Sequence, residues 1–134
     1  MITLFVQTKP RPQQRHRSNG RFQYDPSAKE KKDFIEKVKA RIPKYPNTDN
    51  VTISFTFCYA RPQKHYRSKN KVKILKDDIP YYKTSVPDID NLCKFYMDAM
   101  QGYFYKSDSQ VVSINAIKVY GEESFVLIKM FHTK

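Results

Sequence analysis

The sequence contains little of what builds a disulfide scaffold or a zinc site. Among its 134 residues there are only two cysteines, Cys58 and Cys93, and no C-x-x-C pair. The histidines are scattered, with no H-E-x-x-H pattern and no cysteine spaced to join them. Structural zinc needs nitrogen or sulfur ligands at short, regular spacings. We therefore expect two ordinary buried cysteines, with neither a disulfide nor zinc.

Long apolar runs and a secretory signal are also missing. No stretch of about 18 apolar residues occurs, so we expect no membrane-spanning helix. The first residues, MITLFVQTKPRP, show no basic start before the apolar stretch and no small-residue cleavage site. These features predict a cytoplasmic protein with no membrane partner.

Acidic residues are scarce in most of the chain, and the net charge of +12 is unevenly distributed. Residues 1–87 hold 20 Lys and Arg against 7 Asp and Glu, whereas residues 88–134 hold 5 against 6. Basic side chains also solubilise small domains, which explains a high isoelectric point but not this segregation. A basic part beside a neutral part with clustered carboxylates indicates that the basic part binds a polyanion and the other part has a different role.

The residues that are present predict one compact domain over residues 1–134. An apolar fraction of 40% suffices for a core at this length without disulfides. Strict alternation over 51–59 indicates a half-buried strand, and Asp25-Pro26 is a typical helix start. The expected elements are strand 1–7, a helix from Asp25-Pro26 to about Ile42, strand 51–59, helix 90–101, and strands 110–120 and 124–131 joined as a hairpin at 121–123. This order predicts an α+β fold, a mixed β-sheet with two main helices packed on it.

Two basic segments lie between these elements, a Pro-containing loop at 8–24 and a long loop or flap at 60–87. Their basic side chains can neutralise phosphates without reading a base sequence, and the interleaved aromatic rings can stack on unpaired bases. For Tyr81 and Tyr82, packing of the loop on the core explains the residues equally well. The residues that we expect to contact nucleic acid are Lys9, Arg11, Arg15, Arg17, Arg21, Arg61, Arg67, Lys69, Lys71 and Lys73.

Carboxylates gather where the second expected helix begins, in the stretch PDIDNLCK at 87–94, and another follows before the next strand. Asp88, Asp90 and Asp108 can together hold a hard, oxygen-preferring cation such as Mg²⁺. Lys94 lies one helical turn after Asp90 and can offset negative charge in a transition state. The alternative is structural, because an Asp at a helix start is usually a cap and Asp90–Lys94 is an ordinary i,i+4 pair.

Two further polar residues lie in the same helix. Asp98 is one turn beyond Lys94 on the same face, so it can orient that lysine or simply be solvated. Asn91 can hold a carboxylate that binds the ion, or only complete the first helical turn. We expect both to orient the groups that bind the ion or the substrate, without binding the ion themselves.

The block PDIDNLCKFYMDAMQGYFYKSDSQVVSINAIKVYG resembles the RusA family of Holliday junction resolvases, whose pattern is D-x-D-N-x-x-K, then D-A, G and D-x-Q-V-V before a strand. The opening KPRPQQRHR is similar to that of phage and prophage members. The resemblance implies a homodimer in a bacterial or phage-infected cell that makes paired cuts in four-way junctions with Mg²⁺, or with Mn²⁺ as a substitute. It also implies that Asp88, Asp90, Asp108 and Lys94 are essential, the three aspartates as metal ligands. The long segment 61–87 departs from the short basic stretch of other members.

Two other functions are compatible with the same residues. One is a non-catalytic DNA-binding protein whose aspartates are helix caps. The other is a nuclease that acts on flap DNA or structured RNA. Cleavage that depends on Mg²⁺ separates the first from a nuclease, and a comparison of substrates separates the second.

Overall fold

The computed structural model describes residues 1–14, 17–18, 20, 23–69 and 72–133, without the side chains of 17 and 18. The predictions for Arg15, Arg21 and Lys71, and for the side chain of Arg17, lie outside what is described. Along the chain the elements are β1 (Ile2–Val6), β2 (Arg17–Ser18), β3 (Gln23–Tyr24), α1 (Ala28–Val38), η1 (Lys39–Arg41), β4 (Asn50–Ala60), η2 (Gln63–His65), β5 (Tyr66–Lys69), β6 (Val72–Leu75), α2 (Ile89–Met100), η3 (Asp108–Gln110), β7 (Val111–Gly121) and β8 (Phe125–Thr133).

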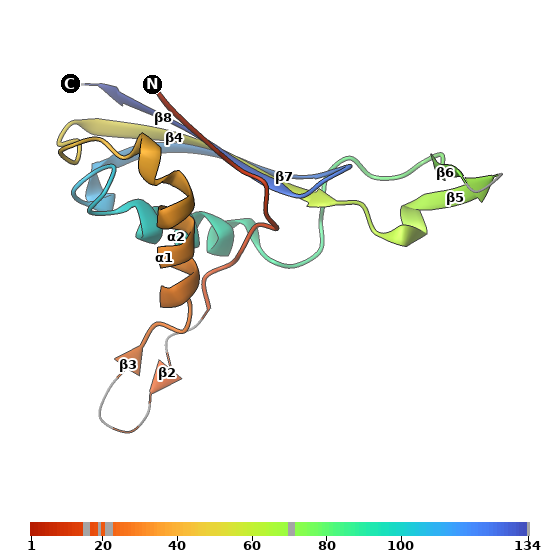
Figure 1. Ribbon diagram of the computed structural model, residues 1–134, viewed down its shortest axis with the longest axis horizontal. Coiled ribbons are helices and arrows are strands. Elements are labelled where there is room, and N and C mark those ends of the chain that lie inside the picture. Colours follow the sequence, from red (N-terminus) through yellow and green to blue (C-terminus); the bar gives the residue numbers. More distant parts are fainter. Residues whose placement is uncertain (15–16, 19, 21–22, 70–71, 134) are drawn as a thin grey trace.

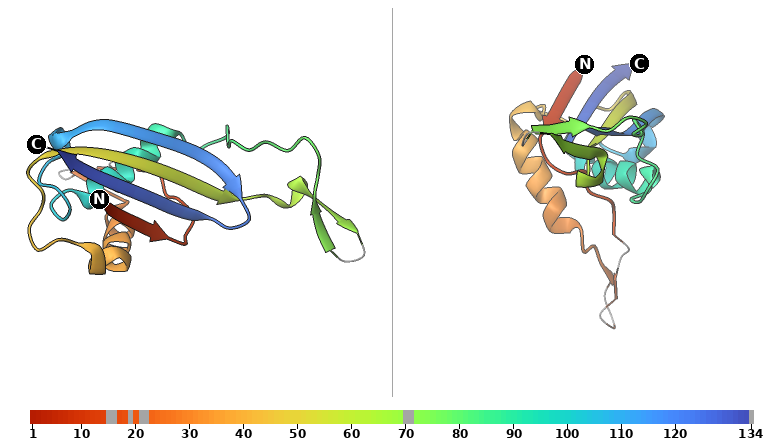
Figure 2. Two further views of the ribbon diagram at one scale, coloured as in Figure 1. Left: turned by 90° about the horizontal axis from the view of Figure 1, so that it is seen from above. Right: turned by 90° about the vertical axis from the view of Figure 1, so that its right-hand side faces the viewer.

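Four strands form one mixed sheet in the order β1-β8-β4-β7, in which β4 and β7 are parallel and the other neighbours are antiparallel. Helices α1 and α2 pack against each other on one face of this sheet (Figure 1 and Figure 2). The predicted α+β fold, with two main helices on a mixed sheet, is therefore confirmed. Within the described ranges, no helix has both the length and the apolar character needed to cross a membrane.

The core lies between β4 and the helices. The side chains of Ile53, Phe55 and Phe57 are fully buried, while the Thr and Ser residues between them are half-buried on the opposite face. This is the alternation that the sequence predicts. The predicted apolar stripe of α2 is buried as well: Leu92, Phe95, Tyr96 and Ala99. The Tyr96 ring stacks on Phe57 with ring centroids 5.7 Å apart, and burial of each such large side chain stabilises the fold by about 1.5–3 kcal/mol.

Helix α1 begins later than predicted, because Asp25 has another role than capping. Ser27 holds the N-cap position, and its backbone N–H donates a hydrogen bond to Asp25 Oδ1 at 2.9 Å. The Lys31 ammonium lies 2.5 Å from Asp25 Oδ2. Burial opposes ionisation of Asp25, but these hydrogen bonds outweigh it and hold the pKa of that carboxyl below its ordinary value. At the other end, helical backbone continues as the 3₁₀ turn η1 and stops just before the predicted Ile42.

The predicted hairpin between the last two strands is wrong. Strands β7 and β8 do not pair with each other, because β4 lies between them and pairs with both. Residues 122–124 cross the end of β4, where the backbone N–H of Ala60 donates to Ser124 Oγ and that of Arg61 to the Gly121 carbonyl. The short segment between β7 and β8 looks like a hairpin turn in the sequence, and it gives no sign that β4 lies between the two strands. The apolar β4 needs partners on both edges, since its buried peptide groups must be hydrogen-bonded.

The segment 60–87, predicted as a long loop or flap, contains a short β-hairpin. Strands β5 and β6 pair antiparallel, and the hairpin extends away from the sheet (Figure 1, right-hand side). Its side chains are exposed or half-buried, so no apolar alternation marks these strands in the sequence. The chain then returns along the free edge of β7, where Tyr82 forms a bridge with Val119. In the segment 8–24, the two-residue strands β2 and β3 pair near the start of α1.

The crossing at Gly121 makes a testable prediction. A Cβ at this position would lie 2.6 Å from the Sγ of Cys58, whose side chain is buried and has little room to move. We expect Gly121→Ala to lower the free energy of unfolding by about 1–3 kcal/mol in a denaturant titration. The control is the same change in a Cys58→Ala background, where the collision is gone. An equally large loss there would show that this contact is not the cause.

Candidate active site

A lysine on β7 holds the chain in place just before α2. The Lys118 ammonium donates hydrogen bonds to the backbone carbonyls of Ser85 and Pro87, at 2.8 and 2.7 Å. These bonds satisfy carbonyl groups in an irregular segment and so determine where the next residue lies. That residue, Asp88, occupies the N-cap position of α2, but its exposed side chain makes no capping hydrogen bond. The Asp88 carboxylate is therefore available to a ligand.

Two adjoining depressions at α2 contain the predicted carboxylates. The first, here called the helix-start depression, is lined by Tyr82, Lys83, Thr84, Asp88, Ile89, Asp90, Ala116, Ile117 and Lys118. The second, here called the carboxylate depression, is lined by Ile89, Asp90, Cys93, Lys94, Met97, Asp98, Asp108, Ile114 and Ala116. The two share Asp90, and residues of β7 contribute to both. The structure thus brings Asp90, Lys94 and Asp108 together and places Asp88 in the neighbouring depression.

Asp108 opens the 3₁₀ turn η3 directly before β7. The Gln110 side chain anchors this turn on two sides. Its Oε1 accepts a hydrogen bond from the Ser107 backbone N–H at 2.8 Å. Its Nε2 donates to the carbonyls of Asn47 and Asp49, each at 2.8 Å. A turn held at both ends keeps the Asp108 carboxylate in a defined position relative to β4.

One oxygen of Asp108, Oδ1, is buried and accepts no hydrogen bond from any residue that the structure describes. Burial raises the pKa of Asp108 above its ordinary value, and the Asp98 carboxylate raises it further, while the Tyr105 hydroxyl and Lys31 act in the opposite direction. A buried carboxylate oxygen without a donor and a second carboxylate beside it both destabilise the ionised form. A bound cation would satisfy the oxygen and offset the repulsion, so the residues fit a positively charged ligand.

The cation paired with Asp98 is Lys31 of α1. The two groups lie 3.5 Å apart, and the same ammonium also pairs with Asp25. Lys94, by contrast, forms no ion pair with any described residue and is exposed beside the carboxylates. Asp98 therefore belongs to a network that runs from α1 toward Asp108, while the Lys94 ammonium is available to a substrate.

The chemistry of the donor set favours a hard cation. The candidate ligands are carboxylates, and the nearby Cys93 thiol stays protonated at neutral pH because burial and the Asp90 charge raise its pKa to about 11. Oxygen ligands suit Mg²⁺ or Mn²⁺ better than zinc. Among the described residues, no three His, Cys, Asp or Glu side chains gather closely enough to hold an ion by themselves. Asp88 and Asp108 line different depressions, so water and substrate oxygens would have to complete any coordination shell.

A third depression adjoins the helix-start depression and is basic. Its lining includes the side chains of Lys9, Lys64 and Lys83 and the rings of Tyr59 and Tyr120, and no acidic residue is among its described members. Lys83 lies in both depressions, with its ammonium 5.0 Å from the centre of the Tyr59 ring. Three cations in a lining that contains no acidic residue suit a phosphate group. We call this site the basic depression.

The N-terminal basic segment lies along α2. The backbone N–H of Arg11 donates to the Tyr96 hydroxyl at 3.1 Å, and that of Gln13 donates to the Asn91 carbonyl at 3.0 Å. The side chains of Arg11 and Asn91 are exposed. The structure thus places Asn91 at a contact with the basic segment through its backbone, next to the predicted carboxylates.

The predicted basic residues of segment 60–87 divide into two groups. Arg67 and Lys69 on β5 and Lys73 on β6 are exposed on the projecting hairpin. Arg61 lies at the base of the hairpin, where its guanidinium donates to the Pro80 carbonyl at 2.8 Å. Arg61 therefore supports the segment, while the other three present their charges to solvent.

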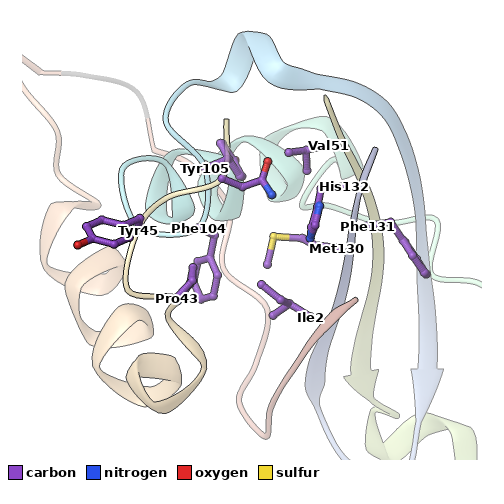
Figure 3. Close-up of a pocket in the computed structure, with 10 residues that line it drawn as sticks. Ile2, Pro43, Tyr45, Val51, Phe104, Tyr105, Met130, Phe131 and His132 are labelled. Atoms are coloured by element: carbon purple, nitrogen blue, oxygen red, sulfur yellow. The ribbon is translucent and has the colours of Figure 1, made fainter. Parts of the chain in front are cut away.

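A fourth, more enclosed pocket lies at the other end of the sheet (Figure 3). Its lining is Ile2, Pro43, Tyr45, Asn47, Val51, Phe104, Tyr105, Met130, Phe131 and His132. This lining contains no carboxylate, lysine or arginine, so it offers neither a set of oxygen ligands for a hard cation nor charge for a phosphate. The three depressions around α2, which do contain such groups, are therefore the candidate site.

The comparisons with known proteins identify the family of the chain. A model of the endodeoxyribonuclease RusA family matches residues 5–130. The chain therefore belongs to the RusA family of endodeoxyribonucleases. It is also similar to the uncharacterized protein YqaN of Bacillus subtilis (strain 168), with 48% identity over 40 residues, which is 30% of this chain and 28% of that protein. The match thus spans well under two thirds of that relative's length.

Three residues that position the site were not predicted from the sequence. Lys118 lies in a strand and is paired with Phe57, on the sheet face that the helices cover. A lysine on a covered face is a signal that its ammonium has a specific partner. Lys31 is one of several lysines in α1 and carries no such signal. Gln110 lies within the D-x-Q-V-V block of the resemblance, but only the fold shows which carbonyls it binds.

The strained environment of Asp108 makes a prediction about stability. Because its pKa is raised in the folded state, its ionisation destabilises the protein as the pH rises through that value. Without added metal, we expect Asp108→Asn to raise the midpoint of thermal unfolding at neutral pH by about 2–5 °C. The gain should vanish below about pH 4, where the wild-type carboxyl is also protonated. Asp33→Asn, on the exposed side of α1, is the matched control and should have little effect. A lower midpoint for Asp108→Asn at neutral pH would contradict the assignment.

Proposed function

We propose that this protein is a Mg²⁺-dependent endonuclease that resolves four-way DNA junctions as a homodimer, with Mn²⁺ as a substitute ion. The observation that supports this best is the continuity of the three depressions. The helix-start depression shares Asp90 with the carboxylate depression and Lys83 with the basic depression. A DNA strand whose phosphate binds the three lysines would therefore lead its neighbouring phosphates toward the carboxylates.

In this proposal, Asp88, Asp90 and Asp108 are the residues that would hold the ion. When bound, the ion would polarise the phosphate and lower the pKa of an attacking water. The buried Oδ1 of Asp108 supports this role, because no described residue donates a hydrogen bond to it. Lys94 stabilises the negative charge that grows on the phosphate oxygens as water adds across the phosphodiester bond. Hydrolysis leaves one end with a phosphate and the other with a hydroxyl group.

Other residues act by positioning these groups. Lys118 holds the segment that ends at Asp88, and Gln110 holds the turn that carries Asp108. Asp98 forms an ion pair with Lys31 and lies close enough to Asp108 for their charges to repel. Its negative charge makes the binding of a cation more favourable. Asn91 links α2 to the N-terminal basic segment.

Affinity for DNA is assigned to the basic residues outside the carboxylates. Lys9 lies in the basic depression, Arg11 is exposed beside α2, and Arg67, Lys69 and Lys73 lie on the projecting hairpin. Their contacts would be with phosphates, which give affinity without base specificity. A four-way junction has two equivalent strands to cut, and one chain carries one set of carboxylates. A two-fold homodimer would supply the second set.

The proposed activity can be tested on a labelled four-way junction. We expect cleavage with Mg²⁺ and none with EDTA. Asp88→Asn, Asp90→Asn and Asp108→Asn should each lower the rate by at least about a thousandfold while binding the junction as well as wild type or better, because each change also removes repulsion toward phosphate.

The exposed Asp77→Asn is the matched control and should cleave normally. Binding without cleavage by the wild type would indicate a non-catalytic DNA-binding protein. Faster cleavage of flap DNA or structured RNA than of the junction would correct the substrate.

A second prediction concerns the hairpin. Each phosphate contact contributes about 0.9 to the slope of log affinity against log salt concentration. If the hairpin lies on DNA, Lys69→Gln combined with Lys73→Gln should flatten this slope by about two units. Lys37→Gln with Lys39→Gln changes two exposed lysines of α1 and η1, which lie away from the hairpin (Figure 1); it removes the same charge and should leave the slope unchanged. Equal slopes for both pairs would place the hairpin away from the nucleic acid.

A further inference from the structure

Two neighbouring tyrosines that could have packed on the core are exposed instead. Tyr81 and Tyr82 have 57% and 58% of their surface exposed. Their rings meet edge to face, with centroids 4.9 Å apart and an angle of 75° between the planes. Burial of an aromatic ring is strongly favourable, so packing of this loop on the core does not account for these side chains. Their exposure calls for another role.

The backbone that carries the two rings is held rigidly. Tyr82 forms an antiparallel bridge with Val119 of β7. On either side of it, Tyr120 N–H donates to the Tyr81 carbonyl at 2.9 Å, and Lys83 N–H donates to the Lys118 carbonyl at 3.0 Å. The Tyr82 ring is thus attached to a fixed backbone, and only its two side-chain torsions remain to be ordered, which lowers the cost of binding a flat group against it.

The position of Tyr82 relates it to the scissile phosphate. Its side chain lines the helix-start depression together with Asp88 and Asp90. The next residue, Lys83, lines both this depression and the basic depression. Tyr82 therefore borders the depression that connects the lysines of the basic depression with Asp88 and Asp90. A nucleobase attached to the strand in this path would be within reach of the ring.

We propose that Tyr82 is a stacking platform for an unpaired nucleobase next to the scissile phosphate, supported by Tyr81, and that it makes the enzyme prefer branched DNA to continuous duplex. In a continuous duplex both faces of a base are already stacked, so exposing one costs free energy; at a branch point that cost is smaller. Stacking of one base on an aromatic ring changes affinity by about 5- to 150-fold. This inference rests on the proposed function, because it assigns the depression to a DNA strand.

The test measures binding in EDTA, so that it does not depend on cleavage. Fluorescence anisotropy gives the affinity for a four-way junction and for a linear duplex of the same sequence. We expect Tyr82→Leu, which keeps the bulk but lacks a π face, to weaken junction binding by at least about fivefold and duplex binding by less than about twofold. Tyr82→Phe keeps the ring and should bind like wild type. Tyr45→Leu is the matched control, since Tyr45 is likewise an exposed tyrosine but lines the more enclosed pocket instead.

A spectroscopic measurement checks the contact itself. 2-Aminopurine, whose fluorescence is quenched by stacking, replaces bases at the branch point one at a time. We expect wild type and Tyr82→Phe to quench at one position, and Tyr82→Leu to leave that position bright. If no position responds to Tyr82→Leu, the stacking proposal is wrong.

The remaining outcomes separate this inference from the proposed function. A wild type that prefers junctions without cleaving them, and loses that preference in Tyr82→Leu, supports the inference and overturns the nuclease assignment. Equal losses for junction and duplex make Tyr82 a general DNA contact and overturn the inference. A change in molecular mass by light scattering in Tyr82→Leu makes the ring a contact between copies of the chain and also overturns it. A wild type without junction preference overturns the inference as well.

Discussion

The pairing of β4 along both edges, under the cover of α2, is the constraint on which the rest of the structure depends. Tyr96 stacks on Phe57 of β4, and its hydroxyl accepts a hydrogen bond from Arg11, so one ring links the core to the basic segment. Opposite Phe57 on β7 lies Lys118, which holds the segment before Asp88. The carboxylates come from the start of α2 and from the turn before β7, and both α2 and β7 contact β4. Loss of either edge would separate the site as well as weaken the core.

The charges of the site show a balance between stability and function. Lys31 neutralises Asp25 and partly neutralises Asp98, but Asp108 keeps a buried oxygen without a partner. A domain selected for stability alone would place a neutral residue there. Functional sites often keep such unfavourable groups, because the ligand supplies the missing interaction. Lys94, which forms no ion pair with a described residue and lies beside these carboxylates, fits the same pattern.

Much of the fold could be predicted because local patterns decide it. The alternation in β4 and the stripe on α2 follow from the periods of strand and helix, which leave a direct mark in the sequence. The strand with which β7 and β8 each pair could not be predicted in this way. Both strands pair with β4, and the turn between them looks the same whether or not another strand lies beneath it. Strands β5 and β6 could not be predicted from an apolar alternation either, because neither face of these strands is fully buried.

By itself, the sequence determined which residue types are available for chemistry: a block of carboxylates with one lysine, and a basic remainder that suits a polyanion. Charge and hydrophobic periodicity are properties of neighbouring residues, so they can be read without the fold. Only the tertiary structure decided which of these groups meet. It paired Asp98 with Lys31, joined Lys9, Lys64 and Lys83 in one depression, and left Tyr82 exposed beside Asp88. Such contacts arise from the packing of distant segments on β4, and no local pattern encodes the distance between side chains that the core alone brings together.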